Sequence, residues 1–180
     1  MDSERLIERL ESGAGIVRPL VRQADGALAG WKPAPGAWSV LEVIAHLLDE
    51  EREDFRVRLR LLLHDPEIEW PPINPESWVA SREYASWDLE ETLDGFLAER
   101  KASVEWLRGL GSPDWNCTKT HPRAGSMTAG DLLGAWVAHD LLHARQLVRL
   151  HWMYVRSLAD PHGVAYAGEW TCRESAEVGS

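Results

Sequence analysis

Residues 137–147, with the sequence VAHDLLHARQL, decide the fold of this chain, because they place two histidines inside an otherwise apolar helix. His139 and His143 are four residues apart, and that spacing returns a side chain to the same helix face one turn on, with Cβ atoms about 6 Å apart. Gln146 follows on the same face, and the opposite side is also largely apolar. Since a helix that is apolar nearly all round is buried, the segment predicts a buried helix that presents two imidazoles to one point.

Buried imidazoles need partners for their ring nitrogens, and a metal ion is one such partner. Histidine pairs one helical turn apart supply two of the ligands in several classes of zinc enzyme. The alternative is two helix histidines with ordinary hydrogen bonds. The glutamine on the same face favours the metal, so we expect a divalent ion here, with zinc, nickel and manganese as candidates.

The helix that carries this pair is one of four that the sequence predicts, over residues 3–23, 39–63, 88–110 and 128–152. Three of them begin with a capping residue and an acid three positions later: Ser39 with Glu42, Asp88 with Glu91, and Thr128 with Asp131. No segment alternates as a strand does, and no internal repeat is present. The pattern therefore predicts an all-α fold, a four-helix bundle.

The bundle is expected to comprise residues 1–155, followed by an irregular C-terminal tail, residues 156–180, that packs on the bundle or at an interface. Two connections, residues 64–87 and 111–127, are long for a bundle, and loops of this length often line a site. The first contains WPPINPESW, residues 70–78, whose tryptophans could pack down as a lid.

The composition of the 180 residues is that of a globular protein, 44% hydrophobic, with ten tryptophans as its unusual feature. The net charge of −10 argues against nucleic acid and anionic membranes as partners. Two cysteines make no disulfide framework, and neither a signal peptide nor an apolar run of about 20 residues is present. We therefore expect a cytoplasmic protein that acts on a small molecule; its apolar helices would also allow a homodimer.

A metal site with an open coordination position usually has three protein ligands. His46 lies two turns into the second predicted helix and could supply the third. On a helical wheel, however, it shares a stripe with Glu42 and Glu50, away from the centre of the apolar face. Spacing alone therefore leaves His46, Glu42 and Glu50 open as the third ligand.

Three segments together resemble the DinB-like, YfiT-like superfamily of metal-binding four-helix bundles: PGAWSVLEVIAHLLDEERED (35–54), HPRAGSMTAGDLL (121–133) and HDLLHARQLVRL (139–150). The resemblance extends in order and spacing over roughly residues 10–150. In that family a tryptophan–serine helix start leads to one histidine, and an H-x-x-x-H-x-x-Q segment supplies two more. The resemblance thus implies His46, His139 and His143 as the ligands of one divalent ion.

The resemblance also implies reaction classes, since relatives include transferases and isomerases that use a low-molecular-weight thiol. A thiol-dependent S-transferase, in which the metal holds the thiol cofactor as a thiolate, is the first expectation. A metal-dependent hydrolase is the alternative, and a metal-binding or stress-related module without catalysis is the third. Near the ion, Gln146 could position substrate or water, Glu50 could accept a proton, and Trp136 could wall the cleft for the cofactor. Asp140 is expected beside a ligand or on the surface.

Overall fold

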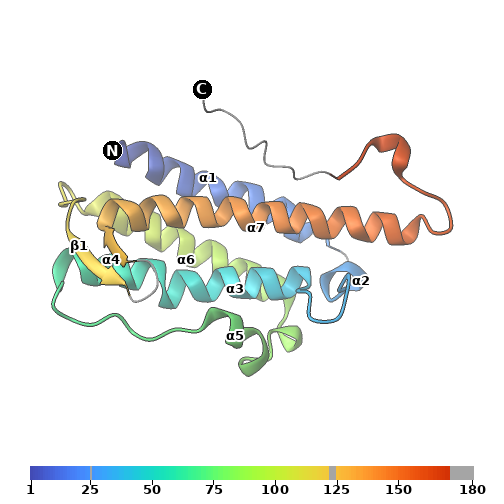
Figure 1. Cartoon of the computed structure of the whole chain (residues 1–180), viewed down its shortest axis with the longest axis horizontal. Coiled ribbons are helices and arrows are strands. Elements are labelled where there is room, and N and C mark those ends of the chain that lie inside the picture. The colour runs from blue at the N-terminus through green and yellow to red at the C-terminus, as the bar shows by residue number, and fades with distance from the viewer. Residues whose placement is uncertain (25, 122–124, 171–180) are drawn as a thin grey trace.

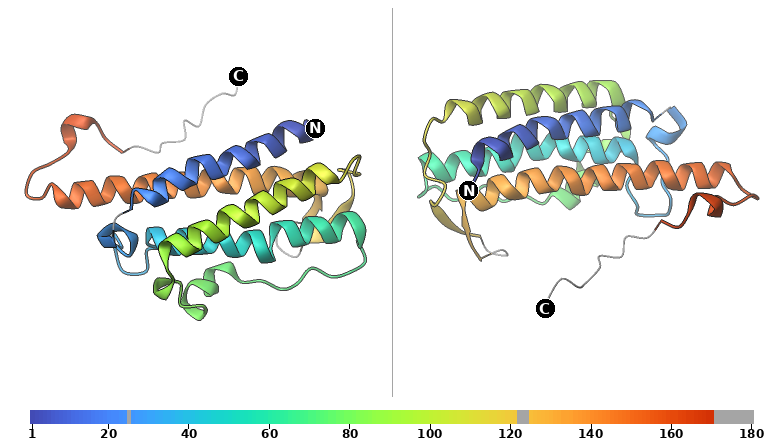
Figure 2. Two further views of the ribbon diagram at one scale, coloured as in Figure 1. Left: turned by 180° about the vertical axis from the view of Figure 1, so that it is seen from behind. Right: turned by 90° about the horizontal axis from the view of Figure 1, so that it is seen from above.

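A computed structural model describes residues 1–24, 26–121 and 125–170, and it confirms the four-helix bundle (Figure 1). The long helices are α1 (Ser3–Arg22), α3 (Val40–Glu53) with its continuation α4 (Phe55–His64), α6 (Leu89–Gly109) and α7 (Ala129–Leu158). Helix α1 packs on α6 and α7, and α3 packs on α6 and α7 (Figure 2). In the described part of the chain, no helix combines the length and apolar character needed to cross a bilayer.

The predicted capping residues start three of these helices. Ser39 and Glu42 form a reciprocal capping box at the start of α3, in which each side chain accepts the other residue's backbone N–H. Thr128 and Asp131 do the same at the start of α7, and the Asp88 side chain accepts the N–H of Glu91 at the start of α6. These bonds satisfy backbone donors that have no partner within the helix.

Two helices differ from their predicted extent. The second is interrupted at Asp54, whose φ of −115° and ψ of −92° separate α3 from α4 without a proline or glycine. The interruption places the ring of Phe55 against Trp136 and His139, with ring centroids 5.7 and 5.1 Å apart. Helix α7 runs to Leu158, beyond the predicted end at Trp152, because no helix-breaking residue precedes Pro161.

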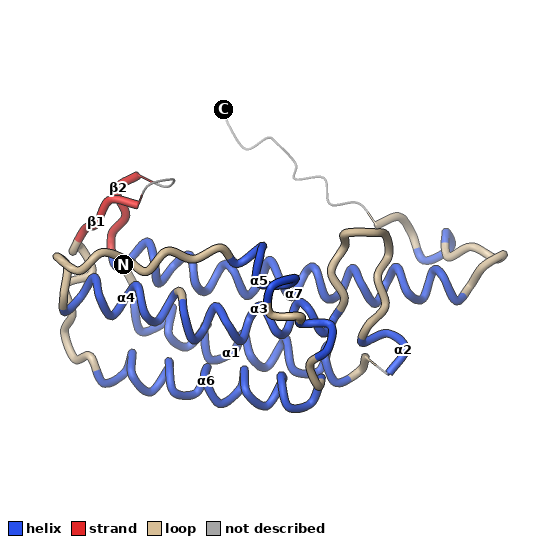
Figure 3. The backbone as a smooth tube through the Cα atoms, turned by 90° about the horizontal axis from the view of Figure 1, so that it is seen from below, coloured by secondary structure: helices blue, strands red, loops and turns tan. Residues whose placement is uncertain are grey.

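The two long connections contain structure of their own. Residues 64–87 include α5 (Pro75–Ser81) and the 3₁₀ helix η1 (Tyr84–Ser86), and Trp78 packs down in a buried cluster with Ala45 and Tyr84. The expectation of no strand was wrong for the second connection, where β1 (Thr118–His121) and β2 (Gly125–Thr128) form an antiparallel hairpin (Figure 3). Four-residue strands are too short to give a readable alternation.

The ends of the bundle are completed by short elements. Helix α2 (Gly26–Ala29) follows α1, and the 3₁₀ helix η2 (Ala165–Ala167) follows α7. The first part of the predicted tail returns to α7, where the rings of Trp170 and Trp152 are 5.6 Å apart. The rest of that tail, residues 171–180, lies outside the described residues.

A charged layer divides the core of the bundle and joins all four long helices. From α6, Arg100 donates to the backbone oxygen of Leu10 on α1 at 2.9 Å, to Glu51 on α3 at 2.7 Å, and to Asp140 on α7 at 2.9 Å. Glu51 also accepts bonds from Ser103 and from the indole N–H of Trp136. One apolar cluster lies on each side of this layer along the helices.

The charged layer decides the position of Asp140, which was expected either beside a ligand or on the surface. Glu51 and Asp140 are only 1% and 2% exposed, and Asp140 is therefore not a surface residue. Charges buried in this way are found in proteins when they are paired and hydrogen-bonded. Both carboxylates meet this condition through Arg100.

Replacing Arg100 should therefore strongly destabilise the bundle. Arg100→Leu leaves two buried carboxylates without their cation, and we expect the free energy of unfolding in urea to fall by about 3–5 kcal/mol at pH 7. Arg108→Leu is the matched control, because Arg108 lies on the same helix and pairs with Glu11 in solvent. Equal effects of the two substitutions would show that burial of the Arg100 pair does not matter.

A second test concerns the close approach of α1 to α7. A Cβ added at Gly13 would overlap Oδ2 of Asp140, whereas one added at Gly15 meets open space. We expect Gly13→Ala to lower the free energy of unfolding by about 1–3 kcal/mol through overpacking. Gly15→Ala should raise it by about 0.5–1 kcal/mol, because alanine favours the helix. A stabilising Gly13→Ala would contradict the close packing seen here.

Candidate metal centre

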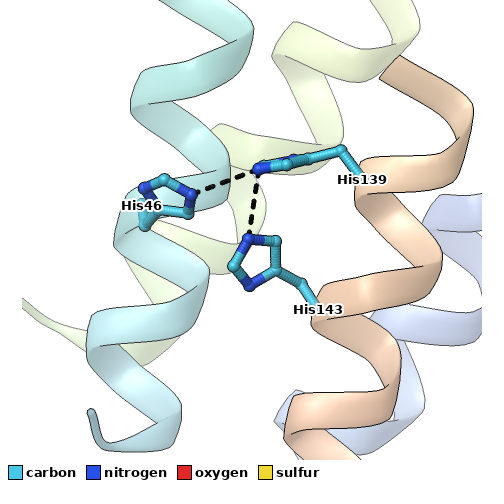
Figure 4. Close-up of side chains that lie close together, drawn as sticks. All are labelled: His46, His139 and His143. Atoms are coloured by element: carbon cyan, nitrogen blue, oxygen red, sulfur yellow. Dashed lines mark hydrogen bonds between the residues drawn. The ribbon is translucent and has the colours of Figure 1, made fainter. Parts of the chain in front are cut away.

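Three histidines from two helices meet at one point near the middle of the bundle. His46 extends from α3, and His139 and His143 extend from α7 (Figure 4). The Nε2 atom of His139 lies 3.5 Å from Nε2 of His46 and 3.2 Å from Nε2 of His143. All three potential ligand atoms lie within 4.8 Å of one another. The structure thus brings together the three histidines that the resemblance implied.

These distances fit a divalent ion. Three imidazoles bound at about 2.0–2.1 Å in a tetrahedral arrangement have their nitrogens about 3.4 Å apart. A set of three histidines suits zinc and its neighbours in the first transition series. The donor set and its spacing therefore match a site with three protein ligands and one further coordination position.

The protonation of the histidines also suits metal binding. Burial, followed by the neighbouring His143, lowers the pKa of His46 to about 3, and burial chiefly lowers that of His139 to about 3. Burial lowers the pKa of His143 as well. The Oε1 atom of Gln146, which can only accept, lies 2.8 Å from Nδ1 of His143. That nitrogen therefore carries the proton, and the lone pair of Nε2 faces the other histidines.

The helical wheel misplaced His46 because α3 is buried on nearly all sides. Glu42 and Glu50, which shared its stripe, are 3% and 4% exposed. Glu42 is engaged with Ser39 and, at 2.6 Å, with Lys32, so it is not brought to the histidine pair. Of the three candidates for the third ligand, His46 is the one that joins His139 and His143.

Glu50 lies behind His46, at 3.9 Å from its Nδ1 atom. Neither this Nδ1 nor Oε1 of Glu50 has a hydrogen-bond partner among the described residues. Burial, and next the charge of Asp54, raise the pKa of Glu50 to about 9. In the protein without metal, Glu50 therefore holds its proton at pH 7, and its role as a proton acceptor stays a prediction.

Aromatic rings enclose the cluster. Trp38 lies 5.0 Å from the ring of His46 and stacks parallel to His143 at 6.3 Å, while Phe55 covers His139. Trp136, which sequence reasoning placed on the cleft wall, is buried behind Phe55 and bonded to Glu51. Trp38 and Phe55 were missed as site residues; the signal for Trp38 was its place directly before the helix cap, eight residues or about two turns before His46.

One side of the cluster reaches solvent through two hollows. A pocket of about 540 Å³ is bounded by Trp38 and by the α7 residues His143, Gln146 and Arg149. A wider hollow of about 870 Å³ borders His139 and His143 and reaches Trp170. A small molecule could therefore approach the histidines from this side.

The buried titratable groups predict how stability depends on pH in the metal-free protein. Below about pH 6.5 the unfolded chain takes up protons on histidines that stay neutral in the native state, so stability falls as the pH falls. Glu50 acts in the opposite sense, because above about pH 4.5 the unfolded chain releases a proton that native Glu50 retains. Below pH 6.5 the three histidines change the free energy of unfolding more than the one glutamate does. Above pH 6.5 the histidines are neutral in both states, and the effect of the glutamate dominates.

We therefore expect the metal-free protein to be most stable near pH 6.5, with the free energy of unfolding falling by about 1 kcal/mol per pH unit on the alkaline side and by about 2–3 kcal/mol per pH unit on the acid side. Urea titrations from pH 5 to 8.5 would measure this, and Glu50→Gln should flatten the alkaline side and steepen the acid side, where the glutamate opposes the histidines. Stability that rises steadily over this range would contradict the assignment of Glu50.

Comparison with known proteins agrees with this geometry. A protein of Oceanobacillus iheyensis named "Putative metal-dependent hydrolase" is 28% identical over 115 residues, which are 64% of this chain and 66% of that protein. The structure of YfiT from Bacillus subtilis, described as a probable metal-dependent hydrolase with an unusual four-helix bundle topology, superposes with a TM-score of 0.73 at 20% identity, covering 82% of this chain and 85% of that one. The family model of the DinB superfamily matches residues 9–147. The chain therefore belongs to the DinB superfamily.

Proposed function

We propose that this protein is a metal-dependent hydrolase of small molecules, with His46, His139 and His143 as the metal ligands. The observation that carries the proposal is the convergence of three neutral imidazoles beside a pocket that reaches solvent. A structural metal site is normally closed by four protein ligands. Three ligands beside an open pocket favour chemistry over a purely structural or binding role.

A divalent ion in such a site acidifies water and polarises a carbonyl or phosphoryl oxygen. Three residues around the histidines fix their orientation and their environment. Gln146 fixes the tautomer and orientation of His143 through Oε1, which leaves its amide N–H groups for a substrate oxygen in the pocket. Trp38 and Phe55 cover the imidazoles on two sides and limit the access of bulk water.

The names of the similar proteins support hydrolysis more than the thiol-dependent S-transfer that the sequence favoured first. Both reactions would use the same coordination position. Within the described residues, no feature specifically indicates a thiol cofactor. The two are separated by experiment, because transfer depends on added thiol and hydrolysis does not.

The first experiment measures bound metal and ester hydrolysis in protein purified without a tag or chelator. We expect about one equivalent of metal, and hydrolysis of 4-nitrophenyl acetate that is lost on chelation, restored by zinc, nickel or manganese, and independent of thiol. His143→Ala should lower metal affinity by about 100-fold or more and abolish the activity.

His151→Ala is the matched control, because His151 lies on the same helix but bonds to the backbone oxygen of Leu20. It should retain both metal and activity. Protein that takes up none of the three ions would refute the proposed function, and activity only in the presence of a thiol would replace hydrolysis by S-transfer.

A further inference from the structure

The face of α7 that carries the metal ligands continues beyond them into the pocket. After His143, the residues of α7 that line the pocket are Gln146, Arg149, Leu150 and Met153. Gln146 follows His143 by three residues, Arg149 and Leu150 follow Gln146 by three and four, and Met153 follows them by four and three, so neighbouring members of the set lie one turn apart. A single helix therefore presents metal ligands, an amide, a guanidinium and an apolar strip to one bound molecule.

Arg149 is a cation without a partner at this site. No acidic side chain of the described residues pairs with it, although Arg82, Arg100 and Arg108 each pair with carboxylates elsewhere in the bundle. The chain has a net charge of −10, so acids were available to neutralise it. An exposed guanidinium that lines a pocket and keeps its five donors unengaged is suited to a planar oxyanion.

The remainder of the pocket is mostly apolar. Trp38 forms one wall, next to the metal ligands, and Leu150 and Met153 continue the surface along α7. Glu76 is the acid among the described lining residues, but it comes from α5, whereas Arg149 lies on the same helix as His143 and Gln146. The guanidinium and the ligand His143 thus line the same pocket.

We propose that this pocket selects substrates with an apolar body and an oxyanion, a carboxylate or a phosphate, and that Arg149 receives the oxyanion. Six residues separate His143 from Arg149, which is about 9 Å along the helix. The oxyanion is therefore several bonds from the group that reacts at the histidines, while the apolar body lies against Trp38. This inference names the substrate class of the proposed hydrolase and rests on that function only for the reaction itself.

The test measures binding rather than turnover. Phenylacetate, its neutral analogue phenylacetamide, and phenyl phosphate are titrated by calorimetry into the full-length protein, both loaded with zinc and after treatment with chelator. We expect at least one of the two anions to bind about tenfold tighter than the amide in both forms. Phenylacetate and phenyl phosphate distinguish a carboxylate from a phosphate as the preferred oxyanion.

Arg149→Gln should reduce this preference to about one, with binding of the amide and the metal content unchanged. Arg156→Gln is the matched control, seven residues further along the same helix and outside the pocket, and should keep the preference. A preference that survives in Arg149→Gln, that appears only with zinc, or that is absent from the unaltered protein overturns the inference, as does failure of all three probes to bind at millimolar concentration.

The outcomes for binding and for hydrolysis are independent. An oxyanion preference that depends on Arg149 in a protein that hydrolyses nothing would support the inference and refute the proposed function. Hydrolysis of neutral esters without any oxyanion preference would support the proposed function and refute the inference.

Discussion

The guanidinium of Arg100 is the interaction on which the bundle depends, because it is the point where all four long helices meet. It bonds to the backbone of α1 and to one carboxylate each from α3 and α7. Apolar side chains would tolerate a helix that slides by one turn, about 5.4 Å, since leucine meets leucine again. A buried charge pair would not tolerate this shift, because both carboxylates would then be buried without their cation. The charged layer therefore sets the register of the four helices.

The metal ligands inherit this register. Asp140, which Arg100 holds, directly follows His139, and Glu51, which the same guanidinium holds, is five residues from His46. Trp136 adds a direct bond from α7 to Glu51. The nitrogen separation of 3.5 Å between His46 on α3 and His139 on α7 requires this kind of positional control. The polar layer and the histidine cluster are thus two parts of one arrangement of α3 against α7.

Local signals in the sequence were sufficient for the helices and for part of the site. Capping residues such as Ser39 and Thr128 act within one turn, and the spacing of His139 and His143 is itself a local distance. The burial of Glu50, Glu51 and Asp140 could not be predicted from the sequence, because acidic residues are mostly exposed in proteins. The cation that pairs with Glu51, Arg100, lies about 50 residues away in the chain. The hairpin was missed because its strands have only four residues, and the interruption at Asp54 has no proline or glycine to mark it. His46 was assigned by family resemblance, not by its own helix.

The position of the histidines within their helices also governs how an ion would enter and leave. His139 and His143 lie near the middle of the 30 residues of α7, and His46 lies in the middle of α3. Helix ends fray at little cost, whereas central turns packed on both sides open only with a large part of the structure. Fraying would not separate these ligands from one another. Exchange of a bound ion would therefore proceed through the solvent side of the cluster, one bond at a time, and its rate would report on access through the pocket instead of on the stability of the bundle.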